Sequence, residues 1–161
     1  MPKGFVDINR IRPAAYFFEQ NGYYTDALPG TKPYYEFWDE EKHRCLYGYT
    51  VSKGTDKEIS ITGFHYFYLN YCPIDRAVDE ELPDGTTQSK RDRSFPSFYD
   101  GDYEYFQEID KARANNRHMI VLKARRKGYS YKAGSMLARN YFFVKNSKNF
   151  VFAAQKEYLI G

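Results

Sequence analysis

The chain has 161 residues and a mass of 19.1 kDa, which fits one ordinary domain or a small accessory region joined to part of a larger one. Its net charge is only +3, so the charge balance alone does not indicate a nucleic-acid-binding protein. No apolar stretch approaches the roughly 18 residues that would cross a bilayer, and Cys45 and Cys72 lack the spacing and histidine partners of a zinc site. These features argue against membrane and zinc proteins and favour a cytosolic one.

The first 62 residues predict short helices and strands separated by turns. Pro13 suits the first turn of a helix over 12–20, which Asn21-Gly22 ends. The segments expected to follow are a turn at 28–33, one helical turn at 37–42, a strand at 46–51, a turn at 52–56 and a partner strand at 58–62. The sequence leaves open whether residues 63–70 form a helix or a strand.

Aromatic residues make up 19% of the chain, with 17 tyrosines, and they concentrate before residue 110. Such rings can stack on the bases of single-stranded nucleic acid. Packing in a small core is the favoured interpretation, because tyrosines that alternate with other residues suit half-buried elements.

Residues 77–94 are the best candidate for a loop or linker, because they contain Pro83, Asp84-Gly85 and scattered charges. A helix is predicted over 102–115, capped by Asp100 or Asp102. One face of this helix contains Tyr103, Phe106, Ile109 and Arg113.

The segment 118–122 is a short apolar run typical of a buried parallel strand, and a helix is predicted from about Ser130 to Phe142. The loop between them, residues 123–130, reads KARRKGYS. It is a Walker A phosphate-binding loop with its lysine moved, because Lys123 replaces the usual first glycine and Tyr129 occupies the usual lysine position. A flexible ammonium at the strand end can lean toward the same phosphates.

Three loop residues have roles that follow from this motif. Lys123 contacts the γ-phosphate, and Gly128 lets the backbone approach phosphate and adopts a positive φ. Ser130 is a Mg²⁺ ligand or the helix N-cap, and both roles are compatible.

The pattern Lys-x-x-Arg-x-Gly-Tyr-Ser, formed by Lys123, Arg126, Gly128, Tyr129 and Ser130, resembles the deviant Walker A loop of bacteriophage terminase large subunits. Residues 95–106 and 61–70 resemble further blocks of these DNA-packaging ATPases, so the resemblance covers roughly residues 60–161. Residues 149–154 then read as the second strand of the ATPase sheet.

The resemblance implies an α/β fold: the first βαβ unit of an incomplete P-loop NTPase domain, preceded by an aromatic-rich mixed α+β region. We expect an accessory region over 1–94, with a linker at about 77–94, and the start of the ATPase domain over 95–161. No apolar strand followed by paired acids occurs after Ser130, as a Walker B segment would require. The chain thus resembles an N-terminal fragment, and we expect no ATP turnover from these residues alone.

The same resemblance implies ATP and Mg²⁺ as cofactors and a location in the host cytoplasm. Its partners would be double-stranded DNA, the small terminase subunit, the portal protein and further copies of itself in a ring. Arg125 or Arg126 would contact the phosphate, and Phe98 and Tyr103 lie where terminases place an adenine-recognition segment. The full expected nucleotide site comprises Lys123, Ala124, Arg125, Arg126, Lys127, Gly128, Tyr129, Ser130, Phe98 and Tyr103.

A different class of function stays open. Residues 123–132 also read as a basic stripe, and the chain would then be a non-catalytic module that binds nucleic acid or protein. In that case binding would weaken steeply with salt and would need no nucleotide.

Overall fold

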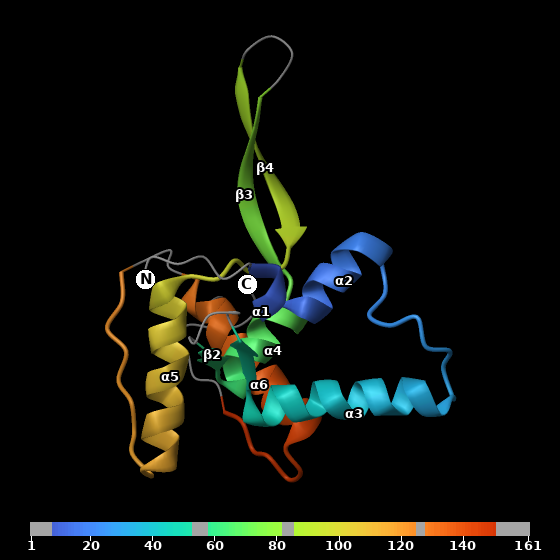
Figure 1. Cartoon of the computed structure of the whole chain (residues 1–161). Coiled ribbons are helices and arrows are strands. Elements are labelled where there is room, and N and C mark those ends of the chain that lie inside the picture. Colours follow the sequence, from blue (N-terminus) through green and yellow to red (C-terminus); the bar gives the residue numbers. More distant parts are fainter. Residues whose placement is uncertain (1–7, 53–57, 82–85, 125–127, 151–161) are drawn as a thin grey trace.

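The computed structural model describes residues 8–52, 58–81, 86–124 and 128–150. These residues form helices packed around a central helix, and two small sheets (Figure 1). The helices are α1 (Ile8–Ile11), α2 (Pro13–Asn21), α3 (Lys32–Tyr47), α4 (Gly63–Tyr71), α5 (Asp100–Ala114) and α6 (Tyr129–Phe143). The strands are β1 (Tyr49–Ser52), β2 (Glu58–Ile61), β3 (Ile74–Glu81) and β4 (Thr87–Ser94).

Helix α4 is the centre of the molecule, and this resolves the question left open for residues 63–70. Thr62 caps the helix by accepting a hydrogen bond from the His65 backbone N–H at 3.2 Å. Every residue from Gly63 to Asn70 is buried, because α2, α3, α5 and α6 all contact this helix. A helix that is buried on all sides lies inside a core, which accounts for the many aromatic residues that left its type uncertain from sequence.

Asn70, fully buried at the end of α4, ties α2 to the core. Its Oδ1 accepts hydrogen bonds from the backbone N–H groups of Ala14 (3.0 Å) and Ala15 (3.1 Å). Arg12 precedes α2 without a side-chain cap of its own, so a side chain from α4 satisfies amides at the start of α2. The packing of α2 is therefore set by a specific polar contact as well as by apolar burial.

The C-terminal end of α3 meets α4 and α6 in a close contact. A Cβ on Gly63 would lie 2.4 Å from the carbonyl oxygen of Cys45, so only glycine lets the two helices approach this closely. Arg139 of α6, only 1% exposed, donates from Nε to the Cys45 carbonyl (2.8 Å) and from Nη2 to the Leu46 carbonyl (2.9 Å). These bonds satisfy carbonyl groups that the end of a helix leaves without partners.

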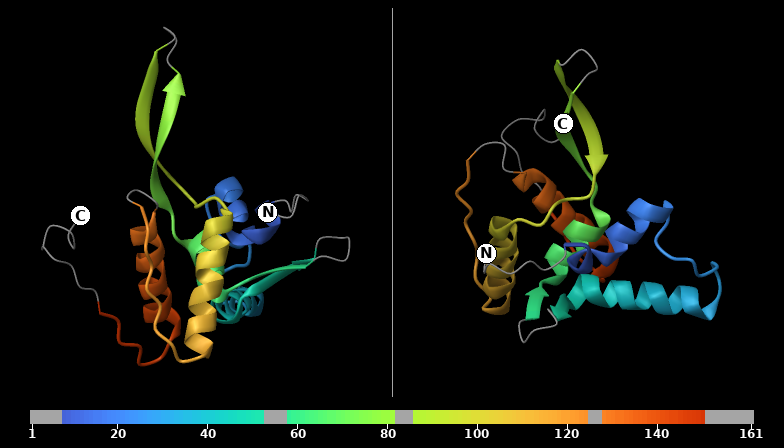
Figure 2. Two further views of the ribbon diagram at one scale, coloured as in Figure 1. Left: turned by 90° about the vertical axis from the view of Figure 1, so that its left-hand side faces the viewer. Right: turned by 45° about the horizontal axis from the view of Figure 1, so that its top comes forward.

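Each sheet is an antiparallel pair of strands. The predicted hairpin of β1 and β2 is confirmed, with Tyr49 opposite Ile61. The prediction of a loop or linker at 77–94 is wrong for the described residues. There β3 and β4 form a ladder that runs from Ile74 opposite Ser94 to Glu81 opposite Thr87. Strands so rich in charge lack the apolar alternation that marks a half-buried strand. This second hairpin projects away from the helices in all three views (Figures 1 and 2).

Three helix predictions are confirmed, and the predictions for 37–42, for the start of the following strand and for the cap of α5 need correction. Helices α2, α5 and α6 match the expected ranges closely, and Gly22 ends α2 with φ 79° as expected. The single helical turn expected at 37–42 is part of the 16-residue helix α3, which delays the following strand to Tyr49. The residue before α5 is Tyr99, so neither Asp100 nor Asp102 is its cap.

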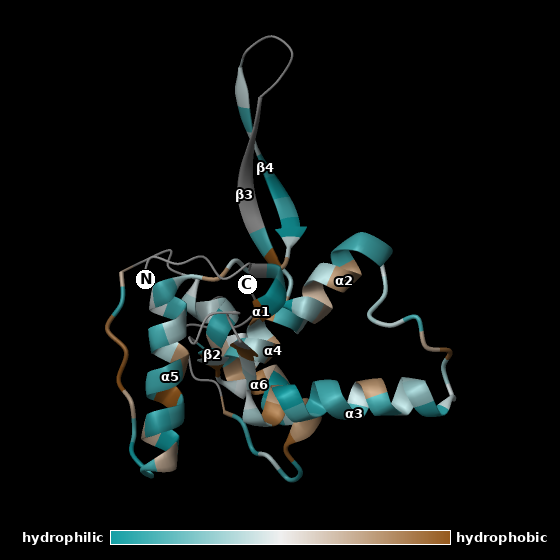
Figure 3. Ribbon diagram, in the orientation of Figure 1, coloured by the Kyte–Doolittle hydropathy of each residue, from teal (hydrophilic) through white to brown (hydrophobic). Residues whose placement is uncertain are grey.

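Residues 118–122, expected to be a buried strand, are not a strand in the structure. Ile120 is 89% exposed and Leu122 is 95% exposed, and Figure 3 shows this apolar segment on the outer side of α5. Within the described residues, the paired strands are β1 with β2 and β3 with β4, and none of them pairs with this segment. The expected neighbour, residues 149–154, lies outside the described part after Phe150, and the parallel α/β sheet stays a prediction.

The core contains side chains from both sides of residue 94. Phe64 and Tyr66 of α4 share one cluster with Phe106 of α5, and Met136 of α6 packs against it. The division into an accessory region and the start of an ATPase domain stays a prediction, and the structure shows that the two parts pack together.

Candidate functional site

At Gly128, near the end of the 123–130 loop, the backbone has the positive φ that the sequence predicts. Gly128 has φ 69° and immediately precedes α6, so its left-handed backbone turns the chain into the helix. A Cβ built on Gly128 meets no atom within 4 Å, so the described structure leaves open space beside it. Ser130, in the first turn of α6, is exposed. Glycine brings no capping side chain, so the first amides of α6 are available to an anion.

The start of the loop is exposed and extended. Lys123 and Ala124 are both exposed and lie outside any helix or strand. Within the described chain, no hydrogen bond or ion pair is seen for the Lys123 side chain. Arg125, Arg126 and Lys127 lie outside the described residues, so the roles expected for the two arginines stay predictions.

Tyr129 is built into a cluster between α5 and α6. Its ring meets the Tyr105 ring edge-on, with centroids 5.0 Å apart, and the Lys132 Nζ lies 4.2 Å from the centre of the Tyr129 ring. Lys132 is only 4% exposed and forms an ion pair with Asp102 of α5. The residue in the usual Walker lysine position therefore faces a lysine from the next turn of the same helix.

This placement alters the basic stripe proposed for residues 123–132. A stripe that binds nucleic acid needs exposed cations, and Lys123 meets that requirement. Lys132 does not, because its ammonium is buried against Asp102. In the sequence Lys132 looks like part of the stripe, because a lysine close to a basic loop shows no sign of burial.

Phe98 and Tyr103 come together with His65 instead of forming an open aromatic face. His65 of α4 is fully buried, and its ring stacks on Phe98 at 5.2 Å and on Phe106 at 4.9 Å. Tyr103 lies 6.0 Å from Phe98 and 6.4 Å from His65 between ring centres. The structure thus gives both residues a packing role, and a contact between them and an adenine base stays a prediction.

Burial sets the protonation state of His65. Removal from water, reinforced by the positive charge of Lys132, lowers the pKa of His65 to about 3. Neither ring nitrogen has a hydrogen-bond partner among the described residues. The imidazole is therefore neutral at physiological pH and cannot serve as a cation toward phosphate.

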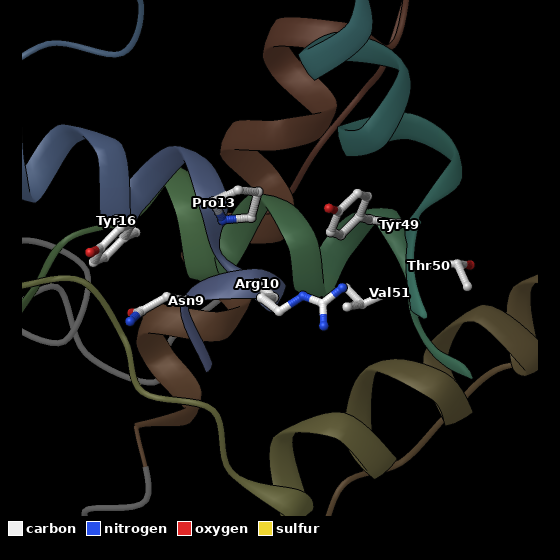
Figure 4. A pocket seen from close by; sticks show the side chains of 7 residues that line it. All are labelled: Asn9, Arg10, Pro13, Tyr16, Tyr49, Thr50 and Val51. Carbon is white, nitrogen blue, oxygen red and sulfur yellow. The ribbon is translucent and has the colours of Figure 1, made fainter. Parts of the chain in front are cut away.

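A surface pocket of about 520 Å³ lies between the first two helices and β1. Arg10 of α1 extends toward Val51 of β1, and Tyr16 and Asn9 lie at the other end (Figure 4). None of its lining residues belongs to the expected nucleotide site. The pocket and the loop motif therefore lie in different parts of the molecule. Of the two, only the loop has residue types and spacing that indicate a particular ligand.

Across residues 8–52, 58–81, 86–124 and 128–150, no three His, Cys, Asp or Glu side chains cluster as a metal site. No helix in the same ranges is both long and apolar enough to cross a membrane.

Comparison of the chain with protein-family models, curated proteins and solved structures finds no match. The likeness to terminases therefore depends on the sequence motifs alone.

Proposed function

We propose that this chain is the ATP-binding N-terminal part of a phage terminase large subunit, the motor that translocates double-stranded DNA into a procapsid. The observation that carries the proposal is the left-handed Gly128, with open space beside it, at the start of α6. A glycine in this conformation ahead of a helix directs successive backbone N–H groups at one point, which suits a phosphate.

The residues around Gly128 fit ATP and Mg²⁺. The exposed Lys123 supplies a mobile ammonium for the terminal phosphates, and no acidic side chain occupies the first turn of α6 to repel them. The exposed Ser130 hydroxyl suits a Mg²⁺ ligand. Mg²⁺ would neutralise phosphate charge, and Arg125 or Arg126 would add a further contact.

The wider assignment follows the resemblance. The partners would be double-stranded DNA, the small terminase subunit, the portal protein and further copies of the chain in a ring, in the host cytoplasm. Turnover of ATP requires carboxylates that order Mg²⁺ and the attacking water. We therefore assign nucleotide binding, and not hydrolysis, to these residues.

The test is binding of MgATP to the 161-residue chain, measured by titration calorimetry for the wild type, Lys123→Ala and Lys148→Ala. Loss of one charge-assisted phosphate contact should weaken binding by roughly 10- to 100-fold in Lys123→Ala. Lys148 is another exposed lysine outside the loop, so Lys148→Ala should bind like the wild type. Equal affinity in all three proteins, or no binding by the folded wild type, would contradict the proposal.

The alternative of a nucleic-acid-binding module is favoured by one observation, the exposed basic residues Lys90, Arg91 and Arg93 on the projecting β4. It predicts DNA binding that weakens steeply with salt and is unaffected by MgATP. A DNA-binding titration at two salt concentrations, with and without MgATP, separates the two functions.

A further inference from the structure

The first turns of α5 and α6 are joined by a buried ion pair. Asp102 is the third residue of α5 and is 7% exposed, and Lys132 is the fourth residue of α6 and is 4% exposed. The Lys132 ammonium forms an ion pair with the Asp102 carboxylate and lies 4.2 Å from the centre of the Tyr129 ring and 5.7 Å from that of Tyr105. The Asp102 carboxylate and the rings of Tyr129 and Tyr105 are thus among the groups around this ammonium.

A buried ion pair is by itself weak evidence of a stabilising role. Removing two charges from water is unfavourable, and apolar pairs of similar volume are often equally stable or more so. An ion pair is more directional than an apolar contact, because the ammonium must meet the carboxylate in a defined geometry. Such a contact fixes how two helices are oriented.

The ion pair orients the first turn of α6, which directly follows Gly128 and supplies the backbone amides expected to bind phosphate. Lys132 lies one helical turn after Gly128, and its backbone N–H donates to the Gly128 carbonyl at 3.3 Å. Tyr129, between them in sequence, covers the ammonium and also contacts Tyr105 of α5. The direction in which α6 begins is therefore tied to α5 through residues immediately after the loop.

We propose that Asp102 and Lys132 are positioning residues for the phosphate loop. Their ion pair holds the first turn of α6 against α5, so that the amides after Gly128 stay aimed at one phosphate position. Tyr129 occupies the usual lysine position because its ring completes the enclosure of Lys132, while the phosphate-binding ammonium comes from Lys123. That the ligand is MgATP rests on the proposed function. That the ion pair orients the first turn of α6 does not depend on it.

The experiment replaces the charged pair with apolar residues of similar size, in Asp102→Leu/Lys132→Met. The matched control is Glu108→Leu/Lys111→Met, which removes an exposed pair on α5 whose side chains are 59% and 64% exposed. Replacing both members avoids leaving an uncompensated buried charge, so both variants should fold. Three quantities are measured for each protein: the melting temperature, the affinity for MgATP and the amide hydrogen exchange of α6.

In Asp102→Leu/Lys132→Met we expect an unchanged or higher melting temperature, about 10-fold weaker MgATP binding through lost preorganisation, and faster exchange at 130–133. Exchange in the second half of α6 should be unchanged. In the control variant all three quantities should match the wild type. A purely structural pair would lower the melting temperature and leave the affinity of the folded protein unchanged.

Two results overturn the inference. The first is wild-type affinity for MgATP in Asp102→Leu/Lys132→Met, which would show that the loop does not need the pair. The second is unchanged exchange at 130–133, which would show that the pair does not fix the start of α6. If the wild type fails to bind MgATP, the proposed function is lost, and the exchange data alone decide whether the pair orients α6.

Discussion

Replacing Arg139 with alanine tests whether one side chain holds the end of α3 in place. Its guanidinium donates to the Cys45 carbonyl at 2.8 Å and to the Leu46 carbonyl at 2.9 Å, and its Cζ lies 4.4 Å from the centre of the Phe64 ring. A hydrogen bond from a charged donor contributes about 1.5–3 kcal/mol, and a desolvated cation–π contact adds about 1–2 kcal/mol. Allowing for water that enters the vacated site, we expect Arg139→Ala to lower the free energy of unfolding by about 3–4 kcal/mol.

The assay is equilibrium unfolding in urea, followed by circular dichroism. Arg117→Ala is the matched control, since it removes an exposed arginine and should change stability by less than about 0.5 kcal/mol. Arg139→Lys keeps the charge but cannot span both carbonyls, so its stability should lie between the other two. If Arg139→Ala unfolds within about 1 kcal/mol of the control, the carbonyl contacts do not stabilise the end of α3.

Two other predictions follow from the core. Gly63→Ala should destabilise the protein by about 2–4 kcal/mol because the added Cβ meets the Cys45 carbonyl at 2.4 Å, whereas Gly134→Ala, in an open helical position, should stabilise it by up to about 1 kcal/mol; equal effects in urea unfolding would contradict the close contact. The low pKa of His65, about 3, means that below pH 6.5 the unfolded chain binds a proton that the folded chain does not. Stability therefore falls as pH is lowered from 6.5 toward 3, by about 2 kcal/mol between pH 7 and pH 5. His65→Phe should lose this part of the pH dependence, and identical unfolding-versus-pH curves for the two proteins would refute it.

The sequence predicts elements well where local signals are strong. Gly22 and Gly128 mark a helix end and a helix start, and both glycines have positive φ. Sequence-based prediction fails where tertiary contacts determine how far an element extends. Residues 37–42 show only one helical turn by pattern, although α3 continues to Tyr47, where Gly48 ends it.

The same limit applies to the candidate site. The loop at 123–130 can be recognised from sequence because its residue types and spacing are typical of phosphate binding. The structure adds that Gly128 is left-handed and that α6 begins directly after it. The partners of Lys132 and Arg139 come from residues 30 and 94 positions away in sequence, Asp102 and Cys45. Separations of that size leave no periodic pattern, so a lysine or arginine that is buried looks the same in sequence as one that is exposed.

The β3–β4 hairpin has a consequence for how this protein can diverge. Its strands pair with each other over eight residues each, and the residues of β4 from Thr87 to Arg93 are exposed. Each added or deleted cross-strand pair changes the reach of this arm by about 3.3 Å and keeps the strand register. Its length and surface chemistry can therefore drift between relatives, or accept a grafted epitope, while the helices that support α4 keep their sequence.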